Sequence, residues 1–509
     1  MENWIFRRND DTPIKKRIDL KAILFGAVIL SAFLLSSCGE AATQPSEGID
    51  TVSQVIAETE AETEDADSGY RDDLDARYDL EGREFRFLSF GNGDPYSWSE
   101  IDVTVEGETG ETINDGIYRR NLVLEDRMNI TIASTWSMQA TNDIVKTVSA
   151  GEDAYDAVWM QISQSGPAAQ QGALLDWNDV PNINMDKKYW DSSMIRDLSV
   201  GGRVYYMTGD ISTIDNQATW TGMFNKDMIA KYGLESPYDL VYSGKWTIDK
   251  FSEMSKNVSR DLDGDGQFTP LDMYGLSTTF DTVYGLFYSS GLTFVGKTAA
   301  DLPYFSLDLN RAQVVLEKTC EIFNRDNTTL CSGRISGDVI TIIRTAFNEN
   351  RALFYCEVMF HVANLRQMEN DFGIIPMPKY DESQDDYITF VNPAGSCLGV
   401  PLTVKSPEES GLVLEAMASA SKEYLTAAYY ETALKGKYAR DEESAEMLDI
   451  LLNNRIYDLA MIYKWGSMPS DYNGLVKNDN TDLASAVAKK EDTINAAIET
   501  FIAAFDDIG

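Results

Sequence analysis

The stretch DLDGDGQFTPLD, residues 261–272, carries the residues whose types and spacing point most directly to chemistry. Aspartates stand at positions one, three, five and twelve, and Gly266 stands at position six. A calcium ion takes six to eight oxygen ligands from a short, sharply turned loop, and this spacing can supply them. The predicted ligands are the carboxylates of Asp261, Asp263, Asp265 and Asp272 and the backbone carbonyl of Gln267, with Thr269 at the position often bridged by water.

This loop departs from the usual calcium pattern at its last position. Asp272 is shorter than the glutamate usual there, so it reaches the ion less easily with both oxygens. A solvated acidic turn is the alternative interpretation. The sequence contains no second loop of this kind, whereas calcium sensors typically pair two. We therefore expect Ca²⁺ to stiffen the fold and not to act as a signal.

Catalysis that depends on histidine is not favoured by this sequence, which contains a single histidine. The single histidine, His361, lies in the apolar stretch MFHVANL, where we expect a partly buried helix residue. No GxSxG, Walker or strand-linked GxGxxG motif is present. A pair of carboxylates, as in a secreted glycosidase, remains the catalytic alternative, because spacing in sequence does not exclude a pair in space.

The N-terminus has the pattern of a secretion signal. Six basic residues precede or border the fourteen-residue run AILFGAVILSAFLL, which is shorter than the roughly twenty residues of a membrane-spanning helix. The following Leu35-Ser36-Ser37-Cys38 resembles a bacterial lipobox, in which cleavage before the cysteine is followed by attachment of lipid. An ordinary signal peptide with an incidental cysteine is the alternative. We expect residues 1–37 to be removed and Cys38 to anchor the protein to the bacterial membrane on its extracytoplasmic side.

An acidic segment follows the predicted anchor. Residues 39–77 hold twelve acidic and two basic residues and few large apolar ones, so this stretch cannot bury a core. We expect a self-repelling tether that separates the folded part from the membrane. The whole chain has a formal net charge of −39, which repels nucleic acid and anionic lipid headgroups.

The remaining chain alternates strand-like and helix-like patterns, which is typical of an α/β fold. EFRFLSF at 84–90, NITIAS at 129–134 and YDAVWM at 155–160 predict strands, the last one buried and parallel. Residues 113–128 place apolar side chains on one helical face. The polar QISQSGP at 161–167 is expected to be a loop. A C-terminal amphipathic helical segment is predicted from the spacing of Leu483, Val487, Ile494, Ile498, Phe501 and Phe505.

Several phrases resemble those of family 1 extracellular solute-binding lipoproteins, the sugar-type receptors of ABC importers, similar in architecture to maltose-binding protein. They are NDGIYRRNLVLEDRMNI, QQGALLDWNDVPNIN, GGRVYYMTGDIS, FNKDMIAKYGLESPYDLVYSGKWTIDKF and DFGIIPMPKYDESQDDY. The resemblance covers most of residues 80–505. It implies a carbohydrate ligand, ABC permease subunits as partners, and a monomer. A surface adhesin that binds glycan without transport shares every one of these sequence features except the partner.

The resemblance also implies a two-lobed, periplasmic-binding-protein-like clamshell with crossing hinge segments and C-terminal helices. Ligand would bind in the cleft, and closure would select one discrete state for the transporter. The chain would leave the first lobe near 207–212 and return near 388–395. The expected parts are the signal 1–37, lipidated cysteine and tether 38–77, first lobe 78–208, second lobe 209–388 with the calcium loop, return to the first lobe 389–425, and helices 426–509 packed on the second lobe.

Sugar recognition needs flat aromatic faces together with carboxylate or amide groups for the hydroxyls. By motif position, the candidate ligand-binding residues are Trp98, Gln161, Ser163, Asp210, Trp220, Glu357, Asn392 and Trp465. Each aromatic could instead serve packing, and each carboxylate could be a solvated or capping group. Trp177, Trp190 and Trp246 are assigned to packing.

Four cysteines remain after the predicted lipidation site, and their pairing stays open. Cys320, Cys331, Cys356 and Cys397 allow three complete pairings. Export permits disulfides without requiring them, and apolar surroundings are also typical of free buried thiols.

Overall fold

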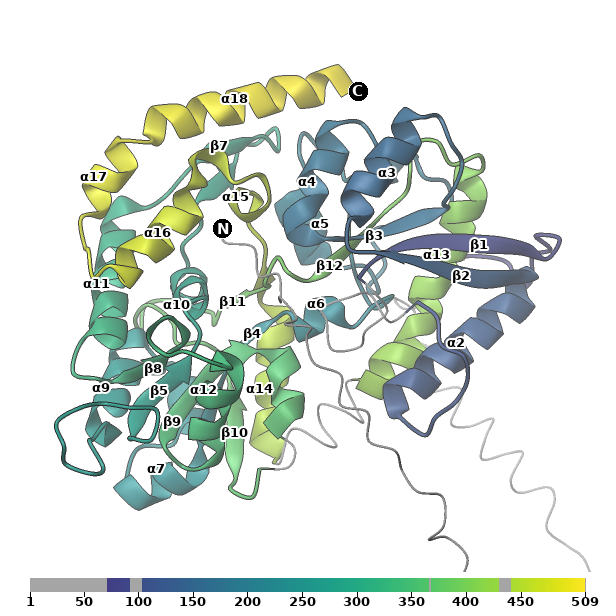
Figure 1. The fold of residues 1–509 in the computed structure, drawn as a ribbon. Helices are drawn as coiled ribbons and strands as arrows, with labels where there is room; N and C mark the ends of the chain where they lie inside the picture. The colour runs from purple at the N-terminus through teal and green to yellow at the C-terminus, as the bar shows by residue number, and fades with distance from the viewer. Residues whose placement is uncertain (1–70, 92–102, 366–367, 430–440, 509) are drawn as a thin grey trace, which may run out of the picture. The chain divides into compact units, whose positions relative to one another are not determined.

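The computed structural model describes residues 71–91, 103–365, 368–429 and 441–508. A first, four-stranded sheet has the strand order β12-β3-β1-β2 (Figure 1). Its strands are β1 (Arg83–Phe90), β2 (Ile130–Ser137), β3 (Ala157–Gln161) and β12 (Ser396–Gly399). β1 runs parallel to β2 and β3, and β12 is antiparallel to β3. The three strands predicted from the sequence are confirmed, and the first four residues of β3 are apolar and buried because both faces of the strand are covered.

Helices pack on this sheet through apolar faces. The predicted helix over 113–128 is confirmed as α2 (Thr112–Met128), which buries Ile117, Leu124 and Met128. It ends at Asn129, whose backbone is left-handed with φ 49°, a conformation that asparagine tolerates. The others near this sheet are α3 (Ala140–Ser149), α4 (Ile162–Gln170), η2 (Trp177–Asp179), α5 (Ser192–Leu198) and α13 (Pro407–Ser421).

The prediction of a loop at 161–167 is wrong, because α4 starts immediately after β3. Its buried side is made of Ile162, Ser165, Gly166, Ala168 and Ala169, which recur at helical spacing. These are mostly small residues, so the apolar periodicity that identifies an amphipathic helix is weak. Gln161 is the extended residue that precedes the helix.

A second sheet has five strands in the order β10-β4-β9-β5-β8. β5 is parallel to β8 and β9, whereas β4 is antiparallel to β9 and β10. The strands are β4 (Trp220–Asn225), β5 (Tyr274–Thr278), β8 (Thr329–Cys331), β9 (Ala352–Val358) and β10 (Phe372–Ile375). The helices that follow or separate them are α7 (Lys226–Tyr232), α8 (Pro237–Tyr242), α9 (Ile248–Val258), α10 (Thr282–Ser289), α11 (Leu309–Asn324), η3 (Ser332–Arg334), α12 (Val339–Asn348) and η4 (Met359–Leu365). A small hairpin, β6 (Val295–Lys297) with β7 (Pro303–Phe305), completes this part.

Two chain segments run antiparallel to each other between the sheets. The backbone of Met207 exchanges hydrogen bonds with Leu398 at 3.0 and 2.8 Å, and Thr219 forms a bridge with Val391. Helix α6 (Ile214–Gln217) lies on the first segment. A third segment joins them where β11 (Thr389–Phe390) pairs in parallel with β13 (Arg455–Ile456). The predicted crossings near 207–212 and 388–395 both fall on these segments.

The C-terminal region is helical, with the predicted apolar positions buried. It contains α14 (Glu442–Asn453), α15 (Leu459–Tyr463), η7 (Trp465–Ser467), α16 (Met468–Lys477), α17 (Leu483–Ala488) and α18 (Glu491–Ile508). The predicted amphipathic segment is two helices, α17 and α18, and all six of its apolar residues are at most 3% exposed. α18 contacts the β7 strand, η7 and also α4, which follows the first sheet (Figure 1). The expected lobe boundaries stay predictions.

The folded part begins before residue 78, within the predicted tether. The Asp72 carboxylate accepts two hydrogen bonds from the Arg127 guanidinium, each at 2.8 Å, and Lys187 Nζ lies 2.7 Å from Asp73 Oδ1. The predicted tether of residues 38–77 is therefore too long at its end, because acidic composition alone does not reveal that some of these charges pair with basic residues of the first lobe.

The four cysteines are free and buried. Burial raises the pKa of the thiols of Cys320 and Cys331 to about 11, that of Cys397 to about 12, and that of Cys356 further, so none is a reactive thiolate. His361 is partly buried in η4, and burial together with the nearby charge of Arg344 lowers its pKa to about 4. None of the helices in the described part of the chain combines the length and the apolar character that spanning a membrane requires.

Candidate ligand-binding site

The end of β3 and the start of α4 place two predicted site residues next to the returning chain. Gln161 Nε2 donates to the carbonyl oxygen of Ala394 at 3.3 Å, and its Oε1 accepts from Gln164 Nε2 at 2.7 Å. Ser163 Oγ donates to the same Oε1 at 3.3 Å. Asn392 Oδ1 accepts the Ala394 N–H at 2.9 Å. Gln161, Ser163 and Asn392 therefore form one polar cluster at the carboxyl end of β3.

Lys464 also belongs to this cluster, although no sequence pattern predicts its place there. Its Nζ lies 3.3 Å from the carbonyl oxygen of Ser163, although the two residues are 301 positions apart. Burial lowers the pKa of Lys464. The only signal in the sequence is that it precedes the candidate Trp465.

Glu357 lies at the carboxyl end of β9, in the second sheet, and is 4% exposed. Its Oε1 accepts the N–H of Thr279 at 3.1 Å. Burial raises the pKa of Glu357 to about 7, the hydrogen bonds from Thr279 oppose this shift, and the charge of Asp281 adds a smaller rise. β9 and β5 are parallel, so their carboxyl ends meet at one edge and bring these residues together.

The same edge carries polar residues that the sequence did not single out. Asp281 directly precedes α10 and is exposed to solvent. Asn473 Nδ2, from α16, donates to the carbonyl oxygen of Phe280 at 3.2 Å. No local motif could have found Asn473, because it reaches this edge from 193 residues further along the chain.

Asp210 lies on the first crossing segment and has partners within the chain. Its Oδ1 accepts from Thr426 Oγ1 at 2.9 Å, and Lys422 Nζ lies 4.0 Å from Oδ2. Both partners belong to η5, a π-helical turn over Lys422–Thr426. Burial raises the pKa of Asp210. No hydrogen bond or ion pair described for this carboxylate joins it to the Gln161 or the Glu357 cluster.

The candidate tryptophans that the structure describes are buried. Trp220 is 1% exposed, and its ring packs over Gly285 of α10. Trp465 is 6% exposed, stacks on Tyr463 with ring centroids 5.3 Å apart, and packs edge-on against Phe501 of α18. This burial favours packing over sugar stacking for both rings. Trp177, Trp190 and Trp246 are buried as expected. Trp98 lies outside the described residues.

A buried charge network joins the crossing segments. Arg455 of β13 donates from Nη1 to Asp215 Oδ2 at 2.8 Å, and its Nη2 lies 3.0 Å from Asp191 Oδ2, on the residue that caps α5. Burial raises the pKa of Asp215 to about 7 although Arg455 opposes this shift. The hydroxyl of Tyr457 also donates to Asp191, at 2.8 Å. One cation therefore holds two carboxylates, one in the first lobe and one on a crossing segment.

The predicted calcium loop brings three of its carboxylates together. Oxygen atoms of Asp261, Asp263 and Asp265 lie within 4.8 Å of one another. The turn depends on Gly264 and Gly266, whose φ angles of 75° and 79° fall in the left-handed region. Asp272 closes the loop by accepting the N–H groups of Leu262 and Thr269 at 2.9 and 2.7 Å.

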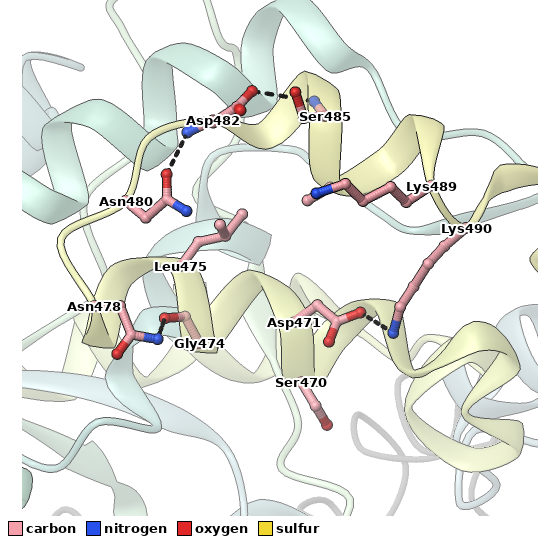
Figure 2. Close-up of a pocket in the computed structure, with 11 residues that line it drawn as sticks. Ser470, Asp471, Gly474, Leu475, Asn478, Asn480, Asp482, Ser485, Lys489 and Lys490 are labelled. Carbon is pink, nitrogen blue, oxygen red and sulfur yellow. Dashed lines mark hydrogen bonds and ion pairs between the residues drawn. The ribbon is translucent and has the colours of Figure 1, made fainter.

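A pocket of about 370 Å³ lies between α16 and α17 (Figure 2). Several of its polar groups bond to one another or to the backbone of the pocket: Asp471 pairs with Lys490, and Asn478 Nδ2 donates to the Gly474 carbonyl at 2.8 Å. It contains none of the predicted site residues. We therefore do not assign the ligand to this pocket.

Comparison with solved structures defines the class of fold. The chain matches the galacto-N-biose-/lacto-N-biose I-binding protein of the ABC transporter from Bifidobacterium longum, solved with lacto-N-biose (TM-score 0.53, 12% identity, 84% of this chain and 99% of that one). It also matches UspC of M. tuberculosis (TM-score 0.54, 13% identity, 81% and 100%). A third match is an ABC substrate-binding protein from Listeria monocytogenes in complex with cycloalternan (TM-score 0.50, 11% identity, 84% and 98%).

The predicted fold class is thus confirmed: this is a two-lobed, periplasmic-binding-protein-like fold, shared with the ABC substrate-binding protein solved with cycloalternan and with the lacto-N-biose I-binding protein. At 11–13% identity, the likeness to these three structures concerns the fold alone. No protein-family model and no curated protein matches the chain.

Proposed function

We propose that this protein is an extracytoplasmic solute receptor that binds a carbohydrate and delivers it to an ABC importer. The observation that carries the proposal is the pair of polar clusters at the carboxyl ends of β3 and β9, in two sheets joined by antiparallel crossing segments. Ligands of open α/β sheets bind outside the carboxyl ends of the strands. The fold is also that of proteins solved with lacto-N-biose and cycloalternan.

The chemistry of the two clusters suits a polyhydroxylated ligand. The amide of Gln161 can donate to and accept from sugar hydroxyls, and the carboxylate of Glu357 accepts from them. Thr279, Asp281 and Asn473 would complete the ligand-binding surface around Glu357. Gln161, Ser163, Glu357 and Asn392 are the predicted residues that we retain as ligand contacts, while Asp210 would serve the crossing region.

The membrane anchor is part of this proposal. Cys38 and the signal lie outside the described residues, so the support for a lipid-anchored protein at the bacterial membrane is the sequence pattern of residues 22–38. A monomer that presents the closed state to permease subunits would complete the role.

We further propose that Ca²⁺ binds the loop at 261–272 and stabilises the second lobe. The donor set fits a hard cation, because three carboxylates converge within 4.8 Å. The Asp265 N–H lowers the pKa of Asp263, but burial and the charges of Asp265 and Asp261 outweigh it and raise that pKa. A bound cation would relieve this repulsion. The carbonyl of Gln267 would add a ligand, and Asp272 would act mainly by closing the loop.

The test is a thermal-shift screen of the full-length protein against a carbohydrate panel, with calcium constant and a detergent that carries no sugar headgroup. A tight ligand should raise the melting temperature by mass action. The hit is then recovered and examined by mass spectrometry. An intact sugar supports the receptor, cleaved sugar supports a glycosidase, and the absence of any hit contradicts a carbohydrate receptor.

A matched pair of variants locates the site. Gln161→Leu should abolish most of the thermal shift, because it removes the amide at the end of β3. Gln171→Leu, at the exposed far end of α4, should leave the shift unchanged. Equal effects of the two substitutions would place the ligand elsewhere.

A further inference from the structure

Helix α4 contains a proline at a position where the helix needs a donor. In an α-helix, the carbonyl of residue i accepts the N–H of residue i+4. For Ser163 that residue is Pro167, which has no N–H. The Ser163 carbonyl, in the first turn of the helix that begins beside Gln161, therefore lacks the N–H that an α-helix supplies from residue i+4.

Lys464 supplies a donor to this carbonyl from a distant part of the chain. Its Nζ lies 3.3 Å from the Ser163 oxygen, and no other hydrogen bond or ion pair is described for this side chain within the residues that the structure covers. Lys464 follows α15 with φ 55° and ψ 34°, a left-handed conformation that costs a lysine about 1 kcal/mol relative to glycine. A left-handed residue that only ends a helix is more often glycine or asparagine than lysine.

The backbone of α4 at Gly166 also lies against side chains of α15. A Cβ atom on Gly166 would lie 2.7 Å from Cε1 of Tyr463, so glycine is required for α15 to approach α4 this closely. The hydroxyls of Tyr463 and Tyr206 lie 3.2 Å apart, which links the same contact to the first lobe. Lys464 therefore starts from a backbone that is fixed against α4.

We propose that Lys464 is a positioning residue, which replaces the missing N–H of Pro167 and fixes the first turn of α4 with Gln161 and Ser163. The C-terminal segment thereby sets the geometry of the polar cluster at the end of β3. The consequence for ligand affinity rests on the proposed function, whereas the coupling between Lys464 and Pro167 does not.

A double-mutant cycle with Lys464→Asn and Pro167→Ala tests the inference. Asparagine tolerates the left-handed conformation, so Lys464→Asn removes the ammonium and keeps the backbone. Pro167 is exposed, so Pro167→Ala restores an N–H at little other cost. We expect Lys464→Asn to weaken binding of the sugar from the screen about tenfold, as for loss of a charged hydrogen bond. Pro167→Ala should restore binding to within about threefold, and Lys464→Arg should retain it.

Two readouts separate this inference from the proposed function. Urea denaturation and hydrogen exchange of the α4 amides, both without sugar, should show that Lys464→Asn destabilises the helix less when Pro167 is alanine. A wild type that binds no sugar but shows this coupling would refute the function and keep the positioning role. If Lys464→Asn weakens binding equally whether residue 167 is proline or alanine, the ammonium contacts the ligand directly. If the effects of Lys464→Asn and Pro167→Ala on stability without sugar are simply additive, the positioning role is overturned.

Discussion

Replacing Glu357 by glutamine should make the stability of the protein less dependent on pH. This carboxyl group is 4% exposed, and burial raises its pKa from 4.5 to about 7. Between these values the unfolded chain loses the proton while the folded protein keeps it. The wild type is therefore most stable, with respect to this group, below pH 4.5, and it loses that stability as the pH rises through 7. Glutamine keeps the shape and does not ionise.

The size of the effect follows from the two pKa values. Linkage gives a loss of stability for the wild type, relative to Glu357→Gln, of about 2–3 kcal/mol between pH 5 and pH 8. The assay is urea denaturation of both proteins at the two pH values, without sugar. Glu84→Gln, at an exposed position on β1, is the matched control and should show no such change. Stability differences for Glu357→Gln that are equal at pH 5 and pH 8 would refute the assignment of a buried, protonated carboxyl group.

Three other predictions concern the packing, the hinge and the metal. Trp465→Ala should cost about 3–5 kcal/mol in urea denaturation, because it removes a ring enclosed by Tyr463 and Phe501, and a cost below about 1 kcal/mol would contradict its role in packing. Arg455→Met should destabilise by about 3–5 kcal/mol, because it leaves Asp191 and Asp215 buried without their cation, and wild-type stability at pH 7 would disprove that role. Asp263→Asn should abolish the rise in melting temperature that calcium gives over chelator, while the sugar that binds stays the same; an unchanged calcium response would remove Asp263 from the site.

Local patterns predicted the elements whose burial is dominated by large apolar residues. The strands at 84–90, 129–134 and 155–160 and the buried face of α2 are examples, and so are the apolar positions of α17 and α18. α4 was not predicted because its buried side consists mostly of glycine, alanine and serine, which give no clear apolar periodicity. The length of the ordered N-terminal segment was missed because acidic composition does not reveal that Arg127 pairs with Asp72.

The candidate site was predictable only where its residues end a recognisable strand. Gln161 is the last residue of β3 and Glu357 is the last but one of β9, so their placement at the strand ends follows from the apolar runs before them. Lys464 and Asn473 arrive from the C-terminal helices, and their partners are about 300 and 190 residues away. Tryptophan content alone does not separate packing from sugar stacking, because the large apolar rings of Trp220 and Trp465 suit both roles; both rings are buried in this structure.

The most direct test of the central claim is a calorimetric titration of the full-length protein with the sugar that gives the largest thermal shift, followed by mass spectrometry of the recovered sugar. A receptor predicts saturable binding at one site per chain, weakened by Gln161→Leu and not by Gln171→Leu, with the sugar returned unchanged. Binding whose affinity is unchanged by both substitutions, or recovery of cleaved sugar, would contradict the receptor function.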